Sequence, residues 1–392
     1  MIINQKTKYN PMKYCVRCVM PDTKPDLRLD AEGVCNACRS YENRKVIDWD
    51  KRKSEMIQVL EKYRSKDQSN YDCLIPVSGG KDSTTQVVRM LEYGMNPLCV
   101  TATTCDLSEL GRKNIANLQR LGVDYIEFTT NRQVRYKLNK FCLEQIGDIS
   151  WAEHVSIFTT PVRMAVQLNI PLLIWGENSQ HEYGGPAGAS ENNVLNRRWL
   201  EEFGGMLGLR VSDLIGVEGI EKKHMIPFTY PSDEELQRVG VTGIFLGYYI
   251  PWDGYTNVLI SQAYGLETFH KNVETTFVNY ENLDNHQAGI HDYFKYLKFG
   301  FSRATDIACL HLRRGRLSRR DACEIVKLHD GKFPWTYLDK PLHEILKPLN
   351  ISVEEFTKIC DRFTNKQIFK TDSRGNLVKD KDGNLTKLLY AE

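Results

Sequence analysis

A glycine turn between a strand pattern and a helix pattern is the feature that most constrains the fold. The turn reads VSGGKDS at residues 77–83. The apolar run 71–76 precedes it, and residues 84–91 after it have helical periodicity. Free N–H groups and the positive end of the dipole make a helix N-terminus favourable for an anion. The sequence therefore predicts a phosphate site where the first strand passes into its helix.

Four side chains of this turn suit a polyphosphate bound together with a metal ion. Ser78 and Ser83 provide hydroxyl groups, Lys81 provides a cation, and Asp82 provides a carboxylate for Mg²⁺. The spacing differs from GxxxxGK[ST] and from the dinucleotide pattern GxGxxG. The chemistry is thus that of a phosphate cradle, but of neither common type.

Strand and helix patterns alternate after the turn, which predicts an α/β fold with a parallel sheet. Ligands then bind at the carboxyl ends of the strands. This places the glycine turn, residues 103–106 and residues 176–178 around one crevice. The expected strands after the first are 97–103, 124–128, 171–176 and 245–250, and the expected helices are 108–121, 132–146 and 156–168. Helices are also expected at 302–314, after a cap at Ser318, and after a cap at Ser352.

Two CxxC pairs near the start of the chain predict a structural zinc site. Cys15 and Cys18 form the first pair, Cys35 and Cys38 form the second, and sixteen residues separate them. This spacing is typical of a zinc ribbon, in which four thiolates close a tetrahedral site. An iron–sulfur cluster or a redox dithiol is the alternative. About thirty residues build no adequate core, so the metal would replace one.

The pattern of composition along the chain predicts five parts. We expect a zinc ribbon at 12–43, a linking helix at 44–70, a domain of alternating strands and helices that contains the glycine turn at 71–260 with an insertion at about 179–225, a mostly helical region at 261–370 and a polar tail at 371–392.

Composition excludes several classes of partner. The net charge of +2 does not provide the broad basic field of a nucleic-acid binder. No apolar run approaches about 18 residues, so no membrane span is expected. Eleven cysteines without a secretory signal are typical of a reducing cytoplasm. Met12 is an alternative to Met1 as the start.

The pattern SGGxDS resembles the PP-loop of the ATP pyrophosphatases, which cleave ATP between the α and β phosphates. The resemblance implies a Rossmann-like PP-loop fold and transfer of AMP to a carbonyl oxygen of the substrate. It implies that Ser78, Gly79, Gly80 and Ser83 hold the pyrophosphate, that Lys81 lies near the phosphates, and that Asp82 positions Mg²⁺. Thr103 and Gly176, at two other strand ends, are further candidates for ATP binding.

The chain as a whole resembles the N-acetyl sugar amidotransferases of bacterial surface-polysaccharide and nonulosonic-acid pathways. The resemblance rests on residues 13–21, 77–83, 175–178, 291–300 and 303–306. It implies conversion of a sugar N-acetyl group to an acetamidino group with ATP and ammonia, in lipopolysaccharide or nonulosonic-acid (pseudaminic or legionaminic type) synthesis. The substrate would be an N-acetylated, nucleotide-linked sugar, although neither the sugar nor its UDP or CMP carrier is specified.

Further roles follow for a few residues outside the turn. Lys298 and Arg303 are candidates for a second cationic clamp, with solvated helix faces as the alternative. Glu177 and Asn178 would contact the sugar or the attacking ammonia, whereas His291 receives no role. The arginines Arg313, Arg314, Arg316, Arg319 and Arg320 are expected to be solvated, or else to form a docking surface or a grip on a diphosphate.

No glutaminase is visible in the sequence, so the resemblance implies separate glutaminase and cyclase-like partner subunits that supply ammonia. Free ammonia is the alternative source. A PP-loop tRNA-thiolating sulfurtransferase is the competing function, with Cys105 as its only plausible reactive thiol. A zinc-ribbon scaffold protein with a vestigial ATP loop is the third possible function. Oligomeric state is not specified by the sequence.

Overall fold

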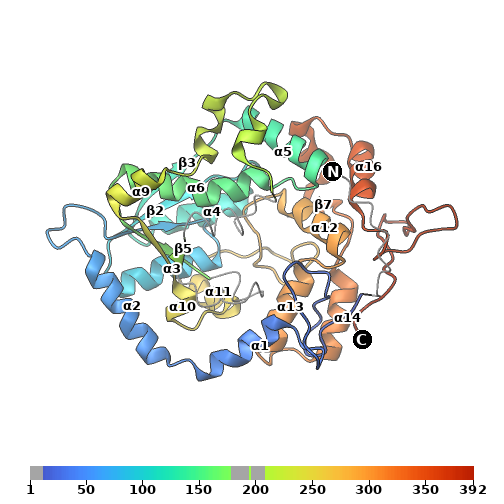
Figure 1. The fold of residues 1–392 in the computed structure, drawn as a ribbon, viewed down its shortest axis with the longest axis horizontal. Coiled ribbons are helices and arrows are strands. Elements are labelled where there is room, and N and C mark those ends of the chain that lie inside the picture. The colour runs from blue at the N-terminus through green and yellow to red at the C-terminus, as the bar shows by residue number, and fades with distance from the viewer. Residues whose placement is uncertain (1–11, 178–193, 196–207) are drawn as a thin grey trace.

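A mixed β-sheet organises the computed structural model of the chain, which describes residues 12–177, 194–195 and 208–392 (Figure 1). Its strand order is β3-β2-β1-β4-β6-β5. The first five strands in this order are parallel, and β5 pairs antiparallel with β6 at the edge. The α/β prediction is therefore confirmed. The strands are β1 (Cys73–Pro76), β2 (Pro97–Ala102), β3 (Asp124–Phe128), β4 (Leu172–Trp175), β5 (Val194–Leu195) and β6 (Thr242–Phe245).

Side chains of the central strands alternate between two apolar layers, as expected for a sheet that is covered on both faces. Ile75 and Ile174 enter the layer that contains α2 and α3. Leu74 and Leu173 enter the opposite layer, against α6. The helices of this part are α2 (Trp49–Tyr63), α3 (Lys81–Glu92), α4 (Glu109–Gln119), α5 (Arg132–Ile146), α6 (Trp151–Gln167), α9 (Asp233–Val239), α10 (Leu246–Tyr249) and α11 (Gly254–Ala263).

The prediction of a strand at 245–250 is wrong. The strand β6 ends at Phe245, and the short helix α10 follows directly. Leu246 and Tyr249 enter the same apolar core as Met56 and Leu60 of α2. The Arg52 guanidinium of α2 lies 3.5 Å from the ring centroid of Tyr248. Aromatic residues favour strands locally, but burial against α2 decides the conformation here.

The sequence also missed two features of this region. The edge strand β5 lies in the polar segment that was expected to be an insertion, and α6 begins five residues before the expected helix. Residues 194–195 and 208–225 of the expected insertion are described. The second range contains the 3-10 helices η3 (Val211–Leu214) and η4 (Val217–Gly219) and the start of η5 (Lys222–Phe228). The rest of the insertion lies outside the described residues.

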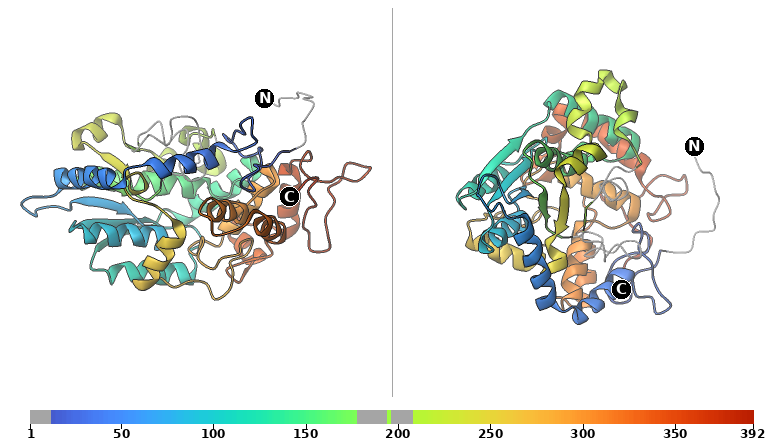
Figure 2. Two further views of the ribbon diagram at one scale, coloured as in Figure 1. Left: turned by 90° about the horizontal axis from the view of Figure 1, so that it is seen from below. Right: turned by 60° about the vertical axis from the view of Figure 1, so that its left-hand side comes forward.

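The N-terminal cysteine segment packs on the helical C-terminal part of the chain, as the dark-blue and orange ribbons show (Figure 1). Val19 and Met20 share a core with Phe301 and Ala308. From there, α1 (Asn36–Asn43), η1 (Arg44–Val46) and α2 run along the outside of the molecule to the sheet (Figure 2). The segment is thus bound at its start to the C-terminal helices and at its end to the sheet.

The C-terminal third contains a second large core around Tyr293, Phe294 and Phe356. Helix caps that the sequence predicted at Ser318 and Ser352 are confirmed, because their hydroxyls accept from the N–H groups of Asp321 and Glu355. No helix in the described ranges combines the length and apolar character needed to cross a bilayer. The elements are α12 (Ala288–Phe299), α13 (Arg303–Arg313), α14 (Arg319–His329), β7 (Thr336–Tyr337), β8 (Lys340–Pro341), α15 (Leu342–Leu346), η6 (Lys347–Leu349) and α16 (Val353–Phe363).

Lys387 fixes the polar tail to this body and makes its attachment sensitive to pH. Its side chain is 3% exposed, and Nζ donates to Tyr14 Oη at 3.0 Å and to the Gly300 carbonyl at 2.9 Å. Burial lowers the pKa of Lys387 to about 8, although the Asp330 carboxylate opposes this. Folding therefore shifts the equilibrium of Lys387 toward the free amine relative to the unfolded chain.

We expect the stability difference between the wild type and Lys387→Met to change with pH. Between about pH 8 and 10.4 the unfolded chain binds more protons at this lysine, so its contribution to the free energy of unfolding rises by roughly 3 kcal/mol. Below pH 8 the contribution is constant. Urea unfolding of both proteins across this range measures the difference. Lys381→Met, at an exposed position in the same tail, is the control. A difference that does not vary with pH would contradict the assignment.

Candidate functional site

The glycine turn lies at the carboxyl end of β1 and leads into α3, as predicted. Gly79 has φ +79°, and a Cβ there would lie 2.6 Å from the backbone nitrogen of Ile115 in α4. Ser78 Oγ accepts from Gly80 N–H at 3.3 Å, and Ser83 Oγ accepts from Ser78 N–H at 3.3 Å. The turn is therefore held by its own hydroxyls and by close contact with α4, which only glycine permits at position 79.

Lys81 and Asp82 form a charged network at the start of α3. Lys81 Nζ lies 2.8 Å from Asp82 Oδ2 and 2.9 Å from Glu281 Oε1. Asp82 Oδ1 accepts from Asn257 Nδ2 at 2.7 Å. Burial opposes the charge of Lys81, but the two carboxylates outweigh it and raise its pKa well above the usual value. A cation therefore lies permanently at the mouth of the turn.

A polar cavity of about 190 Å³ opens over the turn. Residues 78–83 form one side, and residues 280–284 and Arg303 form another. Arg303 begins α13, and its guanidinium donates to both carboxylate oxygens of Asp292, at 3.0 and 3.1 Å. Burial opposes its charge, but Asp292 raises its pKa well above the usual value. The structure thus brings Arg303 into the cavity of the turn, together with Glu177.

A second cavity of about 320 Å³ adjoins the first, and Ser78, Asp82, Ser83, Glu177 and Asp284 line both. Its other walls include apolar side chains from the strand ends and α6. The cavity is apolar inside and polar where it meets the turn. It therefore suits a nucleotide whose flat base lies among the apolar side chains and whose phosphates reach the turn. The apolar lining includes Val100, Ile115, Phe158, Pro161, Trp175 and Phe245.

Gly176 lies in this second cavity, as the strand-end argument predicted. A Cβ at this position would lie 2.5 Å from Gln86 Nε2, so glycine allows the carboxyl end of β4 to approach α3 closely.

Two predicted site residues, Thr103 and Lys298, have side chains that do not line either cavity, and a third, Asn178, lies outside the described residues. Thr103 Oγ1 donates to Glu127 Oε1 at 3.0 Å and does not line either cavity. Lys298 Nζ donates to the Ile146 carbonyl at 2.7 Å and lies 5.6 Å from the ring centroid of Phe363. Burial lowers the pKa of Lys298, while Asp148 opposes this.

Sequence reasoning missed the acidic residues that the segment before α12 contributes. Glu281 pairs with Lys81, and Asp284 lines both cavities. Burial raises the pKa of Asp284 to about 6, and the charge of Glu153 acts in the same direction. The segment 280–284 has no helix or strand pattern, so the only available signal was two carboxylates within four residues. That signal is too common to identify a site.

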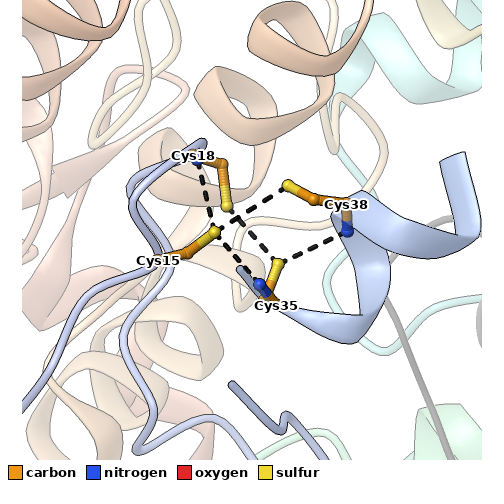
Figure 3. Close-up of side chains that lie close together, drawn as sticks. All are labelled: Cys15, Cys18, Cys35 and Cys38. Atoms are coloured by element: carbon orange, nitrogen blue, oxygen red, sulfur yellow. Dashed lines mark hydrogen bonds between the residues drawn. The ribbon is translucent and has the colours of Figure 1, made fainter. Parts of the chain in front are cut away.

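The four predicted cysteines converge in one buried cluster (Figure 3). Cys15 Sγ lies 4.0 Å from Cys38 Sγ, and Cys18 Sγ lies 3.7 Å from Cys35 Sγ. A tetrahedral ion with Zn–S bonds of about 2.3 Å separates its sulfur atoms by about 3.8 Å. The cluster therefore has the size and the donor set for zinc, and four thiolates leave no open position.

Hydrogen bonds from the backbone support this cluster from within the two CxxC turns. Cys15 Sγ accepts from Cys18 N–H at 3.5 Å and from Cys35 N–H at 3.2 Å. Cys35 Sγ accepts from Cys38 N–H at 3.4 Å and caps α1. Such N–H donors stabilise thiolates and fix their directions.

The expectation that the arginine run is solvated is wrong for three of its five members, Arg313, Arg314 and Arg319, which are at least partly buried. Burial opposes the charge of Arg313, but the sulfurs of Cys309, Cys18, Cys38 and Cys35 raise its pKa. Its positive charge would offset the net negative charge of an ion held by four thiolates. Of the other two, Arg314 pairs with Asp253 and Arg319 donates to the Cys15 carbonyl. Arg316 and Arg320 are exposed, although Arg316 also pairs with Asp253.

Comparison with known proteins gives one match by family. Residues 274–381 match the family described as "LPS biosynthesis protein WbpG-like, C-terminal domain". A search of the curated proteins finds no match. Among solved structures, one described as "Structure of NMN synthetase from Francisella tularensis" aligns with a TM-score of 0.27 and 11% identity, over 52% of this chain and 93% of its own. At that TM-score the likeness does not establish a shared fold.

Proposed function

We propose that the chain is an ATP-dependent, AMP-forming amidotransferase that converts the N-acetyl group of a sugar to an acetamidino group. The sugar would be nucleotide-linked and destined for a lipopolysaccharide or nonulosonic acid. Ammonia would come from a partner glutaminase through a cyclase-like subunit. The work would take place in the cytoplasm.

One observation carries the proposal. The region that resembles a lipopolysaccharide biosynthesis domain contributes residues 280–284 and Arg303 to the same cavity that the glycine turn lines. The glycine turn and the region that matches the lipopolysaccharide-biosynthesis family thus border one polar space. This supports a reaction in which a nucleoside triphosphate activates a sugar derivative.

The chemistry of the amide explains why such a cavity needs donors and cations more than a nucleophile. An amide carbonyl is a poor electrophile, and its oxygen is a poor leaving group. Attack of that oxygen on the α-phosphorus would release pyrophosphate and leave an O-adenylyl imidate. Ammonia would then add to the carbon, and AMP would leave with the former amide oxygen. Orientation and neutralisation of phosphate charge supply most of the acceleration in such transfers.

The residues of the turn divide this work. Backbone N–H groups of Gly79 and Gly80, with the hydroxyls of Ser78 and Ser83, would hold the pyrophosphate. Lys81 and Arg303, which both line the cavity, would offset phosphate charge. The carboxylates of Asp82 and Glu281 border the same space, and hard oxygen donors of this kind fit Mg²⁺. Mg²⁺, when bound, would neutralise part of the phosphate charge.

Asp284 is the candidate that would accept a proton from the added ammonia. It lines both cavities, and its pKa of about 6 leaves it ionised at neutral pH yet basic enough to accept a proton. The charged groups around it in the cavity are Lys81, Asp82, Glu177, Glu281 and Arg303, with Glu153 nearby on α6.

We expect Asp284→Asn to lower kcat by roughly 10²-fold or more, the usual contribution of a general base. In the wild type, kcat should fall as pH drops through about 6, because protonation removes the base. The variant should lose this dependence. The measurement is AMP release against pH, with the concentration of free ammonia held constant. Glu281→Gln is the comparison. It should weaken ATP binding but keep the fall of kcat at low pH. An unchanged pH profile in Asp284→Asn would contradict the role.

A direct test of the proposed function is a screen of UDP- and CMP-linked diacetamido sugars with ATP and ammonium, followed by mass spectrometry. The expected product is lighter than the substrate by the difference between an oxygen atom and an NH group. It should appear only when both ATP and ammonia are present, together with stoichiometric AMP. AMP formation that accompanies no such product from any N-acetylated sugar would overturn the proposal.

The placement of the cysteines does not favour the sulfurtransferase alternative. Burial raises the pKa of Cys105 to about 12, with the charge of Glu153 in support. The thiol therefore stays protonated at neutral pH, and the nucleophile in sulfur transfer is the thiolate. All eleven cysteines lie within the described residues, and none lines either cavity.

A further inference from the structure

Three side chains with metal-binding donors converge at a place that has no part in the proposed reaction. Asp148 lies between α5 and α6, His154 lies in the first turns of α6, and His291 lies in α12. Their donor atoms lie within 4.8 Å of one another. Asp148 and His154 belong to one short stretch of the chain, and the tertiary fold brings His291 to them from α12.

The geometry of the three donors is close to that of a coordination site. His291 Nδ1 lies 3.1 Å from Asp148 Oδ1. When an ion lies about 2.0–2.2 Å from each of its donor atoms, neighbouring donor atoms are roughly 3–3.6 Å apart. The distance between His291 Nδ1 and Asp148 Oδ1 already falls in this range. The imidazole rings of His154 and His291 meet edge to face, with centroids 4.9 Å apart. A small rotation of the His154 ring would complete the triangle.

His154 contributes a second observation. Its Nδ1 is buried and has no hydrogen-bond partner among the residues that the structure describes. A buried polar nitrogen without a partner is costly and calls for an explanation. The Asp148–His291 pair alone does not explain why a second imidazole is buried beside it with an unused nitrogen.

We propose that Asp148, His154 and His291 bind a divalent first-row transition-metal ion of the Zn²⁺ type. Two imidazole nitrogens and one carboxylate favour such an ion over Mg²⁺, which prefers oxygen donors throughout. Three protein ligands leave at least one position open to water or to a substrate atom. This site differs from the four-cysteine cluster in two ways: it has an open coordination position, and two of its donors are nitrogen atoms.

The surroundings tolerate an added positive charge. Arg303 is close enough to act electrostatically on both histidines, but its own charge is met by the two oxygens of Asp292. Lys298 donates to the Ile146 carbonyl rather than to Asp148. His291 keeps 28% of its side chain exposed, which gives an ion a route into the site. Because Arg303 also lines the cavity over the turn, the ion would lie beside the proposed reaction space.

The test is the metal content of the full-length protein without a histidine tag. After incubation with excess Zn²⁺ and gel filtration, the wild type should retain one ion at the cysteines and a second at the new site. His154→Gln and His291→Gln, made separately, should keep the first ion and bind the second at least about 100-fold more weakly. His270→Gln removes an exposed histidine and should behave as the wild type.

Cobalt distinguishes the two sites by their spectra. Co²⁺ bound by four thiolates absorbs through sulfur-to-metal charge transfer, whereas Co²⁺ at nitrogen and oxygen donors does not. The second equivalent should add only weak d–d absorption, and that signal should disappear in His154→Gln and Asp148→Asn. Circular dichroism and thermal unfolding of each variant ensure that the fold is intact. A wild type that holds only the cysteine-bound ion, or a second ion that persists in both histidine variants, would overturn the proposal.

Discussion

Replacement of Asp82 by Asn is expected to lower the rate of ATP-dependent AMP formation by about 10²–10³-fold, the range seen when one polar contact to a charged transition state is removed. The carboxylate borders the cavity over the turn and is held by Lys81 and Asn257. The amide keeps the shape of the side chain but loses the charge that would position Mg²⁺. AMP release under saturating ATP and sugar measures the effect.

Asp50→Asn is the matched control for this substitution. Both aspartates occupy the second position of a helix, Asp82 in α3 and Asp50 in α2. Each carboxylate therefore stabilises its helix to a similar degree by interaction with the positive end of the helix dipole. Asp50→Asn therefore reproduces the general effect of the substitution on helix stability. We expect it to leave AMP formation unchanged. A loss of activity in Asp82→Asn no greater than in Asp50→Asn would show that the carboxylate has no role in the reaction.

Removal of zinc from the four-cysteine cluster is expected to unfold the N-terminal segment and to release α13 and α14 from it. Binding of a structural zinc is worth on the order of 10 kcal/mol at neutral pH, and most of it appears as folding free energy. The segment shares one buried core with Phe301, Ala308, Ala322 and Val326. Loss of the ion should therefore lower the Tm and increase amide hydrogen exchange in both regions.

Cys18→Ser and a chelator should give the same pattern. Cys323→Ser is the comparison, because this cysteine packs beside the same core without belonging to the cluster. It should keep the ion and the protection from exchange. Unchanged exchange in α13 and α14 after the ion has been removed, as shown by metal analysis, would contradict a role for zinc in their packing.

The parts of the site that local sequence patterns determine were predictable. The conformation of the glycine turn depends on residues within a few positions of Gly79, and the cysteine spacing encodes the cluster directly. The parallel sheet followed from the alternation of strand and helix patterns. In each case the information lies within a short stretch of chain.

Features that depend on tertiary packing were not predictable. Lys298 and Arg303 lie five positions apart, but Gly300, with φ +75°, ends α12 between them, and the two side chains reach different surroundings. Arg313 reads as one member of a charged run, yet it is buried because the cysteine segment packs on α13. Asp284 and Glu281 reach the turn only because a segment without regular structure passes over α4.

Helix α13 joins two places that the chain builds from widely separated residues. Arg303, its first residue, lines the cavity over the glycine turn, and Arg313, its last, lies against the cysteines. Eleven residues of α-helix span about 16 Å as a stiff rod. The rod would connect the proposed zinc site with the proposed reaction space. We therefore expect that truncation of the N-terminal ribbon, or its exchange for that of a relative, would shift Arg303 and impair the proposed reaction.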